Sequence, residues 1–207
     1  MTDRTGINAA LAVLEDGGVV AAATETFFGL LADVSRVDAI DRLFELKPRG
    51  ADKGVPILLP GRTAWRGLVE ELPPLAERLA EAFWPGPLTI ALPAASDMDR
   101  RLTLDGTVAV RLPGESPAAE LARLAGQPLT ATSANVPGAP PPKSAAEVRS
   151  AFGGAVTDGR LYVLDGLCPG GRASTVVVVR GGHVRLARAG VIAAHDIARV
   201  TGVELET

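Results

Sequence analysis

Helical and strand patterns alternate along most of this chain, and that alternation restricts it to the α/β class. Apolar residues repeat at helical spacing from Ile7 to Leu14, and two glycines separate them from a short apolar strand at residues 19–23. Further strands are expected at residues 55–59, 88–92, 108–112, 129–132, 161–164 and 174–179, and further helices at 75–83 and 194–200. Strands separated by helices predict a twisted, open sheet flanked by helices.

Two consecutive glycines, Gly181 and Gly182, separate the strand pattern at 174–179 from another at 184–187. A two-residue turn of this kind joins antiparallel neighbours, so it predicts a hairpin and makes the sheet mixed. The chain has no internal repeat and no long linker, and its 207 residues are enough to bury one core. We therefore expect a single domain over residues 1–207.

Capping residues indicate where three helices begin. Ser116-Pro117 places proline at a first helical position, where its missing N–H costs nothing. Ser35 to Asp38 and Ser144 to Glu147 have the spacing of capping boxes. The helix after Ser35 is expected to bury Ile40, Leu43 and Phe44, with Val37 as a further candidate. The helix after Ser144 is expected to end at Gly153-Gly154.

Composition restricts the partners that the surface as a whole can attract. The formal net charge is −3, so phosphate binding requires a local cluster of cations rather than a basic surface. One cysteine excludes an intramolecular disulfide, and two histidines provide no metal-ligand constellation. No apolar run approaches the roughly 20 residues of a membrane span, so no membrane partner and a cytoplasmic location are expected.

Three cations, Lys47, Arg49 and Lys53, precede the strand pattern at 55–59. Most charges of this kind are solvated, and Lys47 alone would complement the negative end of the preceding helix. In an extended segment, however, residues i and i+2 point to one side, so Lys47 and Arg49 can converge on one phosphate. Arginine binds phosphate with a fork of donors and lysine as a point charge, so this segment is a candidate anion site.

Ser133 and Asn135 follow the strand pattern at 129–132 and enter a loop rich in proline and glycine. Their ordinary structural role is a turn at the end of the strand. Hydroxyl and amide groups at such a position are also typical of nucleotide-binding sites. Together with the upstream cations, they indicate a phosphorylated small molecule as the ligand.

Polar residues at other strand ends are weaker candidates, because each has an ordinary structural explanation. These residues are Thr24-Glu25-Thr26, Thr107 with Arg111, Ser174-Thr175, and Arg188 with Gly190. Glu25 is expected to be solvated, and Arg111 is typical of a surface ion pair. His183 and His195 are also expected to be solvated, and nothing in the sequence favours Cys168 as a nucleophile.

In this order, the clusters resemble the YrdC-type L-threonylcarbamoyladenylate synthase family, over roughly residues 7–192. The matching segments are 23–30 (ATETFFGL), 45–54 (ELKPRGADKG), 84–89 (WPGPLT), 108–113 (VAVRLP), 133–135 (SAN), 174–177 (STVV) and 188–192 (RAGVI). Each segment alone is weak, but the ordered set is highly specific.

The resemblance implies an open α/β sheet around a concave basic cavity. It implies an enzyme that forms threonylcarbamoyl-AMP and pyrophosphate from L-threonine, bicarbonate or CO2, and ATP with Mg2+. The product would pass to tRNA threonylcarbamoyl transferase proteins, which modify the tRNA adenosine next to the anticodon. The implied ATP-binding residues are Lys47, Arg49, Lys53, Thr107, Ser133, Asn135 and Arg188, of which Lys47 and Arg49 are also catalytic. The implied threonine-binding residues are Thr26, Ser174 and Arg111, with Arg111 on the carboxylate, and no side chain is implied as a metal ligand.

Several positions depart from the family pattern. Ala23 replaces a usual proline, and Phe28 replaces a common tyrosine. Leu58 replaces a histidine that some longer members place near threonine, while Ala131 and Pro141 replace residues with hydroxyl groups. The Lys-x-Arg segment and the length of the chain resemble the short, single-domain bacterial type.

Three other functions remain open at this point. The fold also suits an RNA-binding or ribosome-maturation module, although an isoelectric point near 5.5 disfavours nonspecific RNA binding. A nucleotide-binding paralogue without threonine adenylation is the second alternative. The third is a carbamoyl-adenylate-forming domain of a hydrogenase-maturation protein, against which the lack of a cysteine-rich segment counts.

Overall fold

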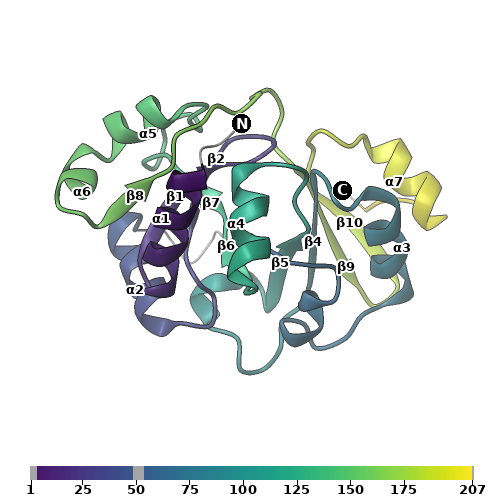
Figure 1. Ribbon diagram of the computed structural model, residues 1–207. Coiled ribbons are helices and arrows are strands. Elements are labelled where there is room, and N and C mark those ends of the chain that lie inside the picture. Colours follow the sequence, from purple (N-terminus) through teal and green to yellow (C-terminus); the bar gives the residue numbers. More distant parts are fainter. Residues whose placement is uncertain (1–3, 49–53, 207) are drawn as a thin grey trace.

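The computed structural model describes residues 4–48 and 54–206, which form two β-sheets with helices packed around them (Figure 1). One sheet has the strand order β7-β2-β1-β8, and the other has the order β10-β9-β4-β5-β3-β6. Both sheets contain parallel and antiparallel pairs, so the expected mixed α/β class is confirmed, with two sheets instead of one. Within the described part of the chain, no helix is long and apolar enough to cross a membrane.

The four-stranded sheet is covered by helices on both faces. Its strands are β1 (Val19–Ala23), β2 (Phe28–Leu31), β7 (Thr132–Ser133) and β8 (Leu161–Val163). The helices around it are α1 (Arg4–Glu15), α2 (Val37–Leu46), α4 (Pro117–Ala125), α5 (Ala145–Ala151) and α6 (Gly153–Thr157). One face of β1 packs in a core with α1 and α4, and the other face packs with α2, α5 and α6. All five residues of β1 are buried for this reason, and a strand covered on both faces is apolar throughout.

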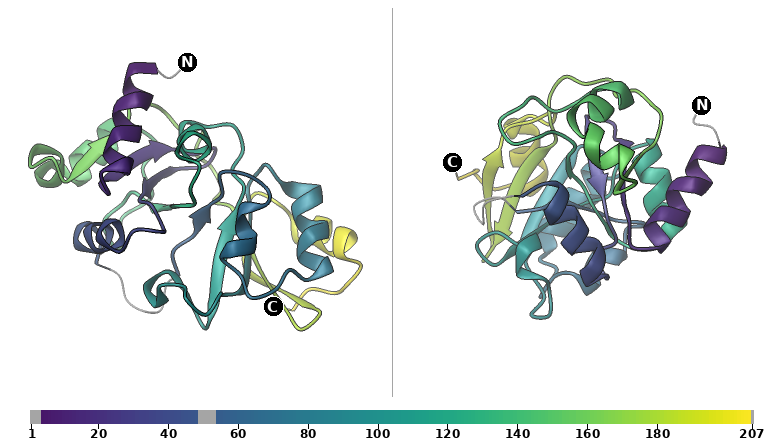
Figure 2. Two further views of the ribbon diagram at one scale, coloured as in Figure 1. Left: turned by 60° about the horizontal axis from the view of Figure 1, so that its bottom comes forward. Right: turned by 90° about the vertical axis from the view of Figure 1, so that its left-hand side faces the viewer.

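The six-stranded sheet is covered by helices on one face only. Its strands are β3 (Ile57–Leu58), β4 (Leu88–Pro93), β5 (Thr107–Arg111), β6 (Leu129–Thr130), β9 (Thr175–Arg180) and β10 (His183–Arg188). The other elements on this side of the molecule are α3 (Pro74–Phe83), α7 (Ala194–Thr201) and the short helices η1 (Ala64–Gly67) and η2 (Arg100–Leu102). α3 and α7 pack against each other at one end of the molecule (Figures 1 and 2).

The two faces of the six-stranded sheet have different environments. Ile90 and Val177 belong to the core formed with α3, α7 and η1, whereas their neighbours Ala91 and Val178 line a cavity on the opposite face. This alternation follows from the two-residue period of a strand, which points successive side chains to opposite faces. The sheet therefore provides one packed face and one face available to a ligand.

The two sheets meet where the chain passes from β6 to β7. Thr130 is fully buried, and its hydroxyl donates to the Leu30 carbonyl (3.0 Å) and accepts from the Ala32 N–H (2.9 Å). The next residue, Ala131, donates its N–H to the Pro56 carbonyl (2.7 Å) in the register of the β3–β6 pair, but Pro56 has no N–H to return a bond, so the ladder ends here. The single strand expected at 129–132 is therefore two short strands, one in each sheet.

Three local predictions are confirmed. The glycine pair 181–182 has positive φ at both positions and joins β9 to β10 as a hairpin. The Ser116 hydroxyl accepts from the Ala119 N–H at the start of α4. The Ser144 hydroxyl accepts from the Glu147 N–H at the start of α5.

The capping box expected at Ser35 is wrong. The N–H and hydroxyl of Ser35 both donate to Asp33 Oδ1, at 2.8 and 2.7 Å, so a local turn takes up the side chain that would cap the helix. Arg36 is the N-cap of α2 instead, and its guanidinium binds the Asp38 carboxylate. Val37 is 66% exposed at the first helical position and does not belong to the buried face.

Three other boundaries also differ from the prediction. Gly153-Gly154 begins α6 and does not end the preceding helix, since neither glycine adopts the positive φ of a helix C-cap. The strand expected at 55–59 is reduced to β3, and β2 was not predicted at all.

Candidate active site

Two adjoining cavities follow the uncovered face of the six-stranded sheet. The larger has a volume of about 500 Å³ and lies over β4, β5, β9 and β10. The smaller has a volume of about 220 Å³ and lies where this face meets the ends of β1, β2 and β7. Gly54, Pro56, Thr89 and Arg188 line both cavities, so the two volumes meet at these residues.

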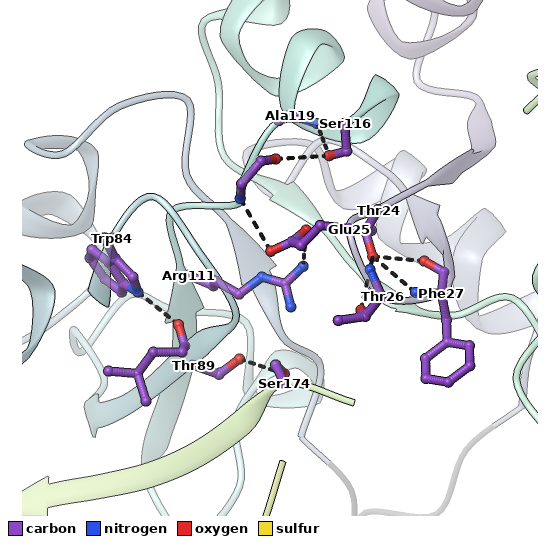
Figure 3. A network of polar contacts seen from close by, with 12 residues as sticks. Thr24, Glu25, Thr26, Phe27, Trp84, Thr89, Arg111, Ser116, Ala119 and Ser174 are labelled. Atoms are coloured by element: carbon purple, nitrogen blue, oxygen red, sulfur yellow. Dashed lines mark hydrogen bonds and ion pairs between the residues drawn. The ribbon is translucent and has the colours of Figure 1, made fainter. Parts of the chain in front are cut away.

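Arg111, the last residue of β5, lies buried at the smaller cavity. Its Nη2 donates to Glu25 Oε2 (3.0 Å), and Glu25 Oε1 accepts from the Gly114 N–H (3.1 Å), as Figure 3 shows. Burial lowers the pKa of Arg111, Glu25 opposes this shift, and the nearby Arg188 adds to it. An arginine stays protonated in a protein, so Glu25 offsets much of the cost of burying this charge. The ion pair is buried, so the expectations of a solvated Glu25 and of a surface pair are both wrong.

Thr24 and Thr26 form the turn between β1 and β2. The Thr24 hydroxyl accepts from the N–H groups of Thr26 and Phe27 and donates to the Phe27 carbonyl (2.7 Å). A hydroxyl has one proton, so in the 3.0 Å contact between the two threonine hydroxyls Thr26 must be the donor. Thr26, which lines the smaller cavity, therefore presents acceptor lone pairs there.

Ser174 lines the smaller cavity and contacts Arg188 and Thr89, which line both cavities. Its carbonyl accepts from Nε and Nη2 of Arg188 at 3.1 and 3.0 Å, and its hydroxyl accepts from Nη2 at 2.9 Å. The same hydroxyl lies 3.0 Å from the hydroxyl of Thr89, a residue that lines both cavities. Burial lowers the pKa of Arg188. The guanidinium is thus held by neutral oxygen atoms at the point where the cavities meet.

Lys47 lies at the C-cap of α2 and extends to the end of β7. Its Nζ donates to the Ser133 carbonyl (2.5 Å), the Ser133 hydroxyl (3.2 Å) and Asn135 Oδ1 (3.0 Å). Only 7% of Lys47 is exposed, so its ammonium group is held by these oxygen atoms away from solvent. The lysine and the Ser133–Asn135 segment form one hydrogen-bonded cluster, and Ser133 lines the smaller cavity.

The structure brings most of the sequence-predicted residues to these cavities. Those that line a cavity are Thr26, Thr107, Arg111, Ser133, Ser174 and Arg188. Lys47 and Asn135 contact this set through Ser133. Arg49 and Lys53 lie outside the described residues, so the convergence of Lys47 and Arg49 on one phosphate stays a prediction.

Sequence reasoning missed the contributions of Glu25 and Thr89. Both belong to segments that carry the family resemblance, but nothing near them in sequence indicates a partner. Glu25 pairs with a residue 86 positions away, and Thr89 contacts one 85 positions away.

The positions that depart from the family pattern make part of the smaller cavity apolar. Phe28, Leu58, Ala131 and Pro141 all line it. Their side chains supply no hydrogen-bonding group, so the polar side chains of this cavity are those of Arg111, Arg188 and the hydroxyl residues.

Other chemistry-bearing residues do not form a second site in the part of the chain that the structure describes. It contains no group of three or more His, Cys, Asp or Glu able to hold a metal ion. The side chains of His183 and His195 are 70% and 82% exposed, as expected. Burial raises the pKa of Cys168 to about 11, which leaves the thiol protonated and unreactive at neutral pH.

The chain is similar in sequence to known proteins. The Sua5, YciO and YrdC family, which carries the description "Telomere recombination", matches residues 12–190. A threonylcarbamoyl-AMP synthase of Pyrococcus abyssi is 41% identical over 152 residues, which is 72% of this chain and 44% of that protein. A threonylcarbamoyl-AMP synthase of Thiobacillus denitrificans is 39% identical over 153 residues, which is 72% of this chain and 81% of that protein.

A solved structure shows the same fold. The crystal structure of P. abyssi Sua5 in complex with L-threonine superposes with a TM-score of 0.87 at 35% sequence identity. The match covers 97% of this chain and 58% of that protein, so the chain spans little more than half of its archaeal relative.

Proposed function

Because the chain belongs to the Sua5, YciO and YrdC family, we propose that it is a threonylcarbamoyl-AMP synthase. The substrates would be L-threonine, bicarbonate or CO2, and ATP, with pyrophosphate as the second product. The observation that carries the proposal is the buried Arg111 beside hydroxyl groups in a small cavity, which joins a larger cavity at Arg188. One end suits an amino acid and the other a nucleotide.

The smaller cavity offers groups for each polar part of an amino acid. Arg111 has a buried Nε without a partner among the described residues, and a carboxylate is its natural acceptor. Thr26 presents acceptor lone pairs, which suit the amine. Ser174, held between Thr89 and Arg188, would bind the ligand from the other side of the cavity.

The nucleotide would extend from the larger cavity toward Lys47. Arg188 and Thr107 line the larger cavity, and Ser133 with Asn135 adjoins Lys47 at the far end. Arg49 and Lys53 complete the proposed ATP-binding set. Cations and hydroxyls arranged in this way neutralise and orient phosphate groups.

The chemistry requires positioning more than a side-chain nucleophile. The threonine amine nitrogen attacks the carbon of CO2 and loses a proton, which yields a carbamate. A carbamate oxygen then attacks the α-phosphorus, and the bond to the bridging oxygen of pyrophosphate breaks. The first step depends on holding the amine next to CO2. The second depends on holding the carbamate oxygen in line with the leaving pyrophosphate and on stabilising the phosphate charge, for which Lys47 and Arg49 are the proposed catalytic groups.

Mg2+ enters the proposal with ATP as part of the substrate. The residues proposed to bind ATP carry cations, hydroxyls and one amide, so phosphate oxygens and water would hold this ion.

Downstream, the product would pass to tRNA threonylcarbamoyl transferase proteins that modify tRNA. The proposal includes a cytoplasmic location, where ATP and tRNA occur together.

Pyrophosphate release by the purified chain tests the proposal, with L-threonine and bicarbonate omitted in turn. Release is expected to require both, and Lys47→Ala is expected to lower the rate at least about 100-fold because phosphate charge stabilisation is lost. Arg78→Ala, on the exposed side of α3, is the control and should retain the wild-type rate. Release without threonine, or full activity of Lys47→Ala, would contradict the assignment. ATP binding without release would favour the paralogue, and RNA binding without ATP binding would favour the RNA-binding module.

A further inference from the structure

We propose that Glu25 is a positioning residue, which fixes the guanidinium of Arg111 so that it receives the carboxylate of the amino-acid substrate. The inference rests on the proposed function, because it concerns the amino-acid end of the same site. Glu25 does not line either cavity, so it acts through Arg111 and not by contact with the ligand.

Two hydrogen bonds hold the Glu25 carboxylate between fixed points. Oε1 accepts from the Gly114 N–H (3.1 Å), which belongs to the loop after β5, and Oε2 accepts from Nη2 of Arg111 (3.0 Å). The Cγ of Glu25 lies 3.5 Å from the position that a Cβ on Gly114 would take, so the side chain lies beside this glycine. The loop therefore limits where the carboxylate can move, and the carboxylate limits where Arg111 can turn.

Arg111 has unused hydrogen-bonding capacity. Its side chain is 7% exposed, and its Nε has no partner among the described residues. An unpaired buried donor costs free energy, so sites that contain one commonly complete it with a ligand. In Figure 3 the guanidinium lies between Glu25 and Thr26 on one side and the Thr89–Ser174 pair on the other, at the wall of the smaller cavity.

The charges explain why the partner is a carboxylate. Arg111 and Arg188 both line the smaller cavity, and their repulsion adds to the lowering of the Arg111 pKa that burial causes. Glu25 supplies one negative charge beside these two cations, so a net positive charge remains for the carboxylate that Arg111 receives. With Glu25 absent, Arg111 would turn away from Arg188 and its donors would leave the ligand.

A purely structural role for Glu25 makes a different prediction. If it only ties the β1–β2 turn to the loop at Gly114, its removal lowers stability and affects all ligands alike. If it positions Arg111, its removal weakens recognition of the carboxylate selectively.

The test measures dissociation constants by calorimetry for L-threonine and for L-threoninamide, which lacks the carboxylate, with wild type, Glu25→Gln and Glu25→Ala. Wild type should bind L-threonine at least about tenfold more tightly than the amide, and both variants should lose most of that preference. In an Arg111→Ala background, Glu25→Ala should change threonine binding by less than about twofold, because coupled residues are not additive. Asp158→Ala, which removes an exposed ion pair with Arg160, is the matched control and should leave the preference unchanged.

Equal weakening of both ligands, or an additive double variant, would overturn the inference. Glu25→Gln keeps the length of the side chain and one hydrogen bond, so it provides the measurement if Glu25→Ala does not fold. Wild-type protein that binds neither ligand would overturn the proposed function as well. Normal wild-type turnover with unaffected Glu25 variants would overturn only the role of Glu25.

Discussion

Arg111 and Arg188 approach the same cavity from different strands, but their environments differ. Arg111 is buried and paired with the carboxylate of Glu25. Arg188 donates only to the neutral carbonyl and hydroxyl of Ser174 among the described contacts, and no carboxylate of the described residues forms an ion pair with it. The difference shows how one cavity can treat two anionic groups differently.

A cation that is paired with a protein carboxylate adds little net positive charge to a cavity, but its hydrogen-bond donors keep a fixed orientation. Arg111 is therefore suited to a single carboxylate of fixed orientation. A cation held by neutral oxygens keeps its full charge toward the ligand, which suits a triphosphate with several negative charges. Substitutions of Arg111 and Arg188 should consequently differ in their effects on L-threonine and on ATP.

Arg188→Ala should have the largest effect, because it removes a charge that no carboxylate of the described residues balances. We expect kcat/KM for ATP to fall about 1000-fold in the pyrophosphate-release assay. Arg199→Ala, on the exposed surface of α7, provides the control. A loss below about tenfold would show that Arg188 does not stabilise the phosphate groups.

Arg111→Lys should affect the smaller cavity, which is the proposed L-threonine site. Lysine keeps the charge but cannot bind Glu25 and a carboxylate with a planar fork, so KM for L-threonine should rise about 30-fold while KM for ATP changes less than about threefold. Steady-state kinetics with each substrate varied in turn measures the difference. Equal increases in both KM values would mean that the two arginines are not assigned to separate substrates.

Gly190→Ala tests the backbone around Ser174, which holds Arg188, without removing a charge. A Cβ at position 190 would lie 2.3 Å from the Thr175 nitrogen and 2.4 Å from the Ala173 carbonyl oxygen, so the segment after β10 must move away from the backbone around Ser174. Overpacking of this kind typically costs about 1–3 kcal/mol, so we expect Tm to fall by about 3–10 °C. Activity should fall about tenfold as Ser174 and Arg188 separate.

Gly67→Ala is the matched control for that substitution. A Cβ at this position meets no atom within 4 Å, so it should change neither Tm nor activity. An unchanged Tm for Gly190→Ala would show that the backbone around Ser174 adapts more easily than the geometry indicates.

Cys168→Ser should have the smallest effect, because Cys168 lines neither the smaller nor the larger cavity. KM for either substrate should change less than about twofold. Burial raises the thiol pKa to about 11. Alkylation by iodoacetamide should therefore be slow at pH 8 and should accelerate as the pH approaches 11.

The same shift predicts the sign of a pH effect on stability. The folded state keeps the thiol proton at pH values where the unfolded state has lost it. This contribution is therefore present below the unfolded pKa and is lost as pH rises toward 11. Urea unfolding at pH 7.5 and pH 10.5 should show a larger loss for wild type than for Cys168→Ser. Fast labelling at pH 8 would contradict a partly buried, protonated thiol.

Much of the fold was predictable because its signals are local. The glycine pair at 181–182 and the serine caps at 116 and 144 act within a few residues, and those predictions are confirmed. The capping box at Ser35 failed because Asp33, two residues before it, competed for the same side chain. β2 was missed because its four residues have no strand alternation and are buried on both faces.

The sequence by itself determined the α/β class, the order of the motifs and the types of residue available for anion binding, because periodicity, turn chemistry and motif order are properties of neighbouring residues. Only the tertiary structure decided which of these residues form ion pairs and hydrogen bonds with one another. Glu25 and Arg111 are 86 positions apart, and so are Lys47 and Ser133. Their contacts depend on which faces of two sheets are covered and where those sheets meet, and burial then turns an ordinary turn glutamate into the partner of a buried arginine.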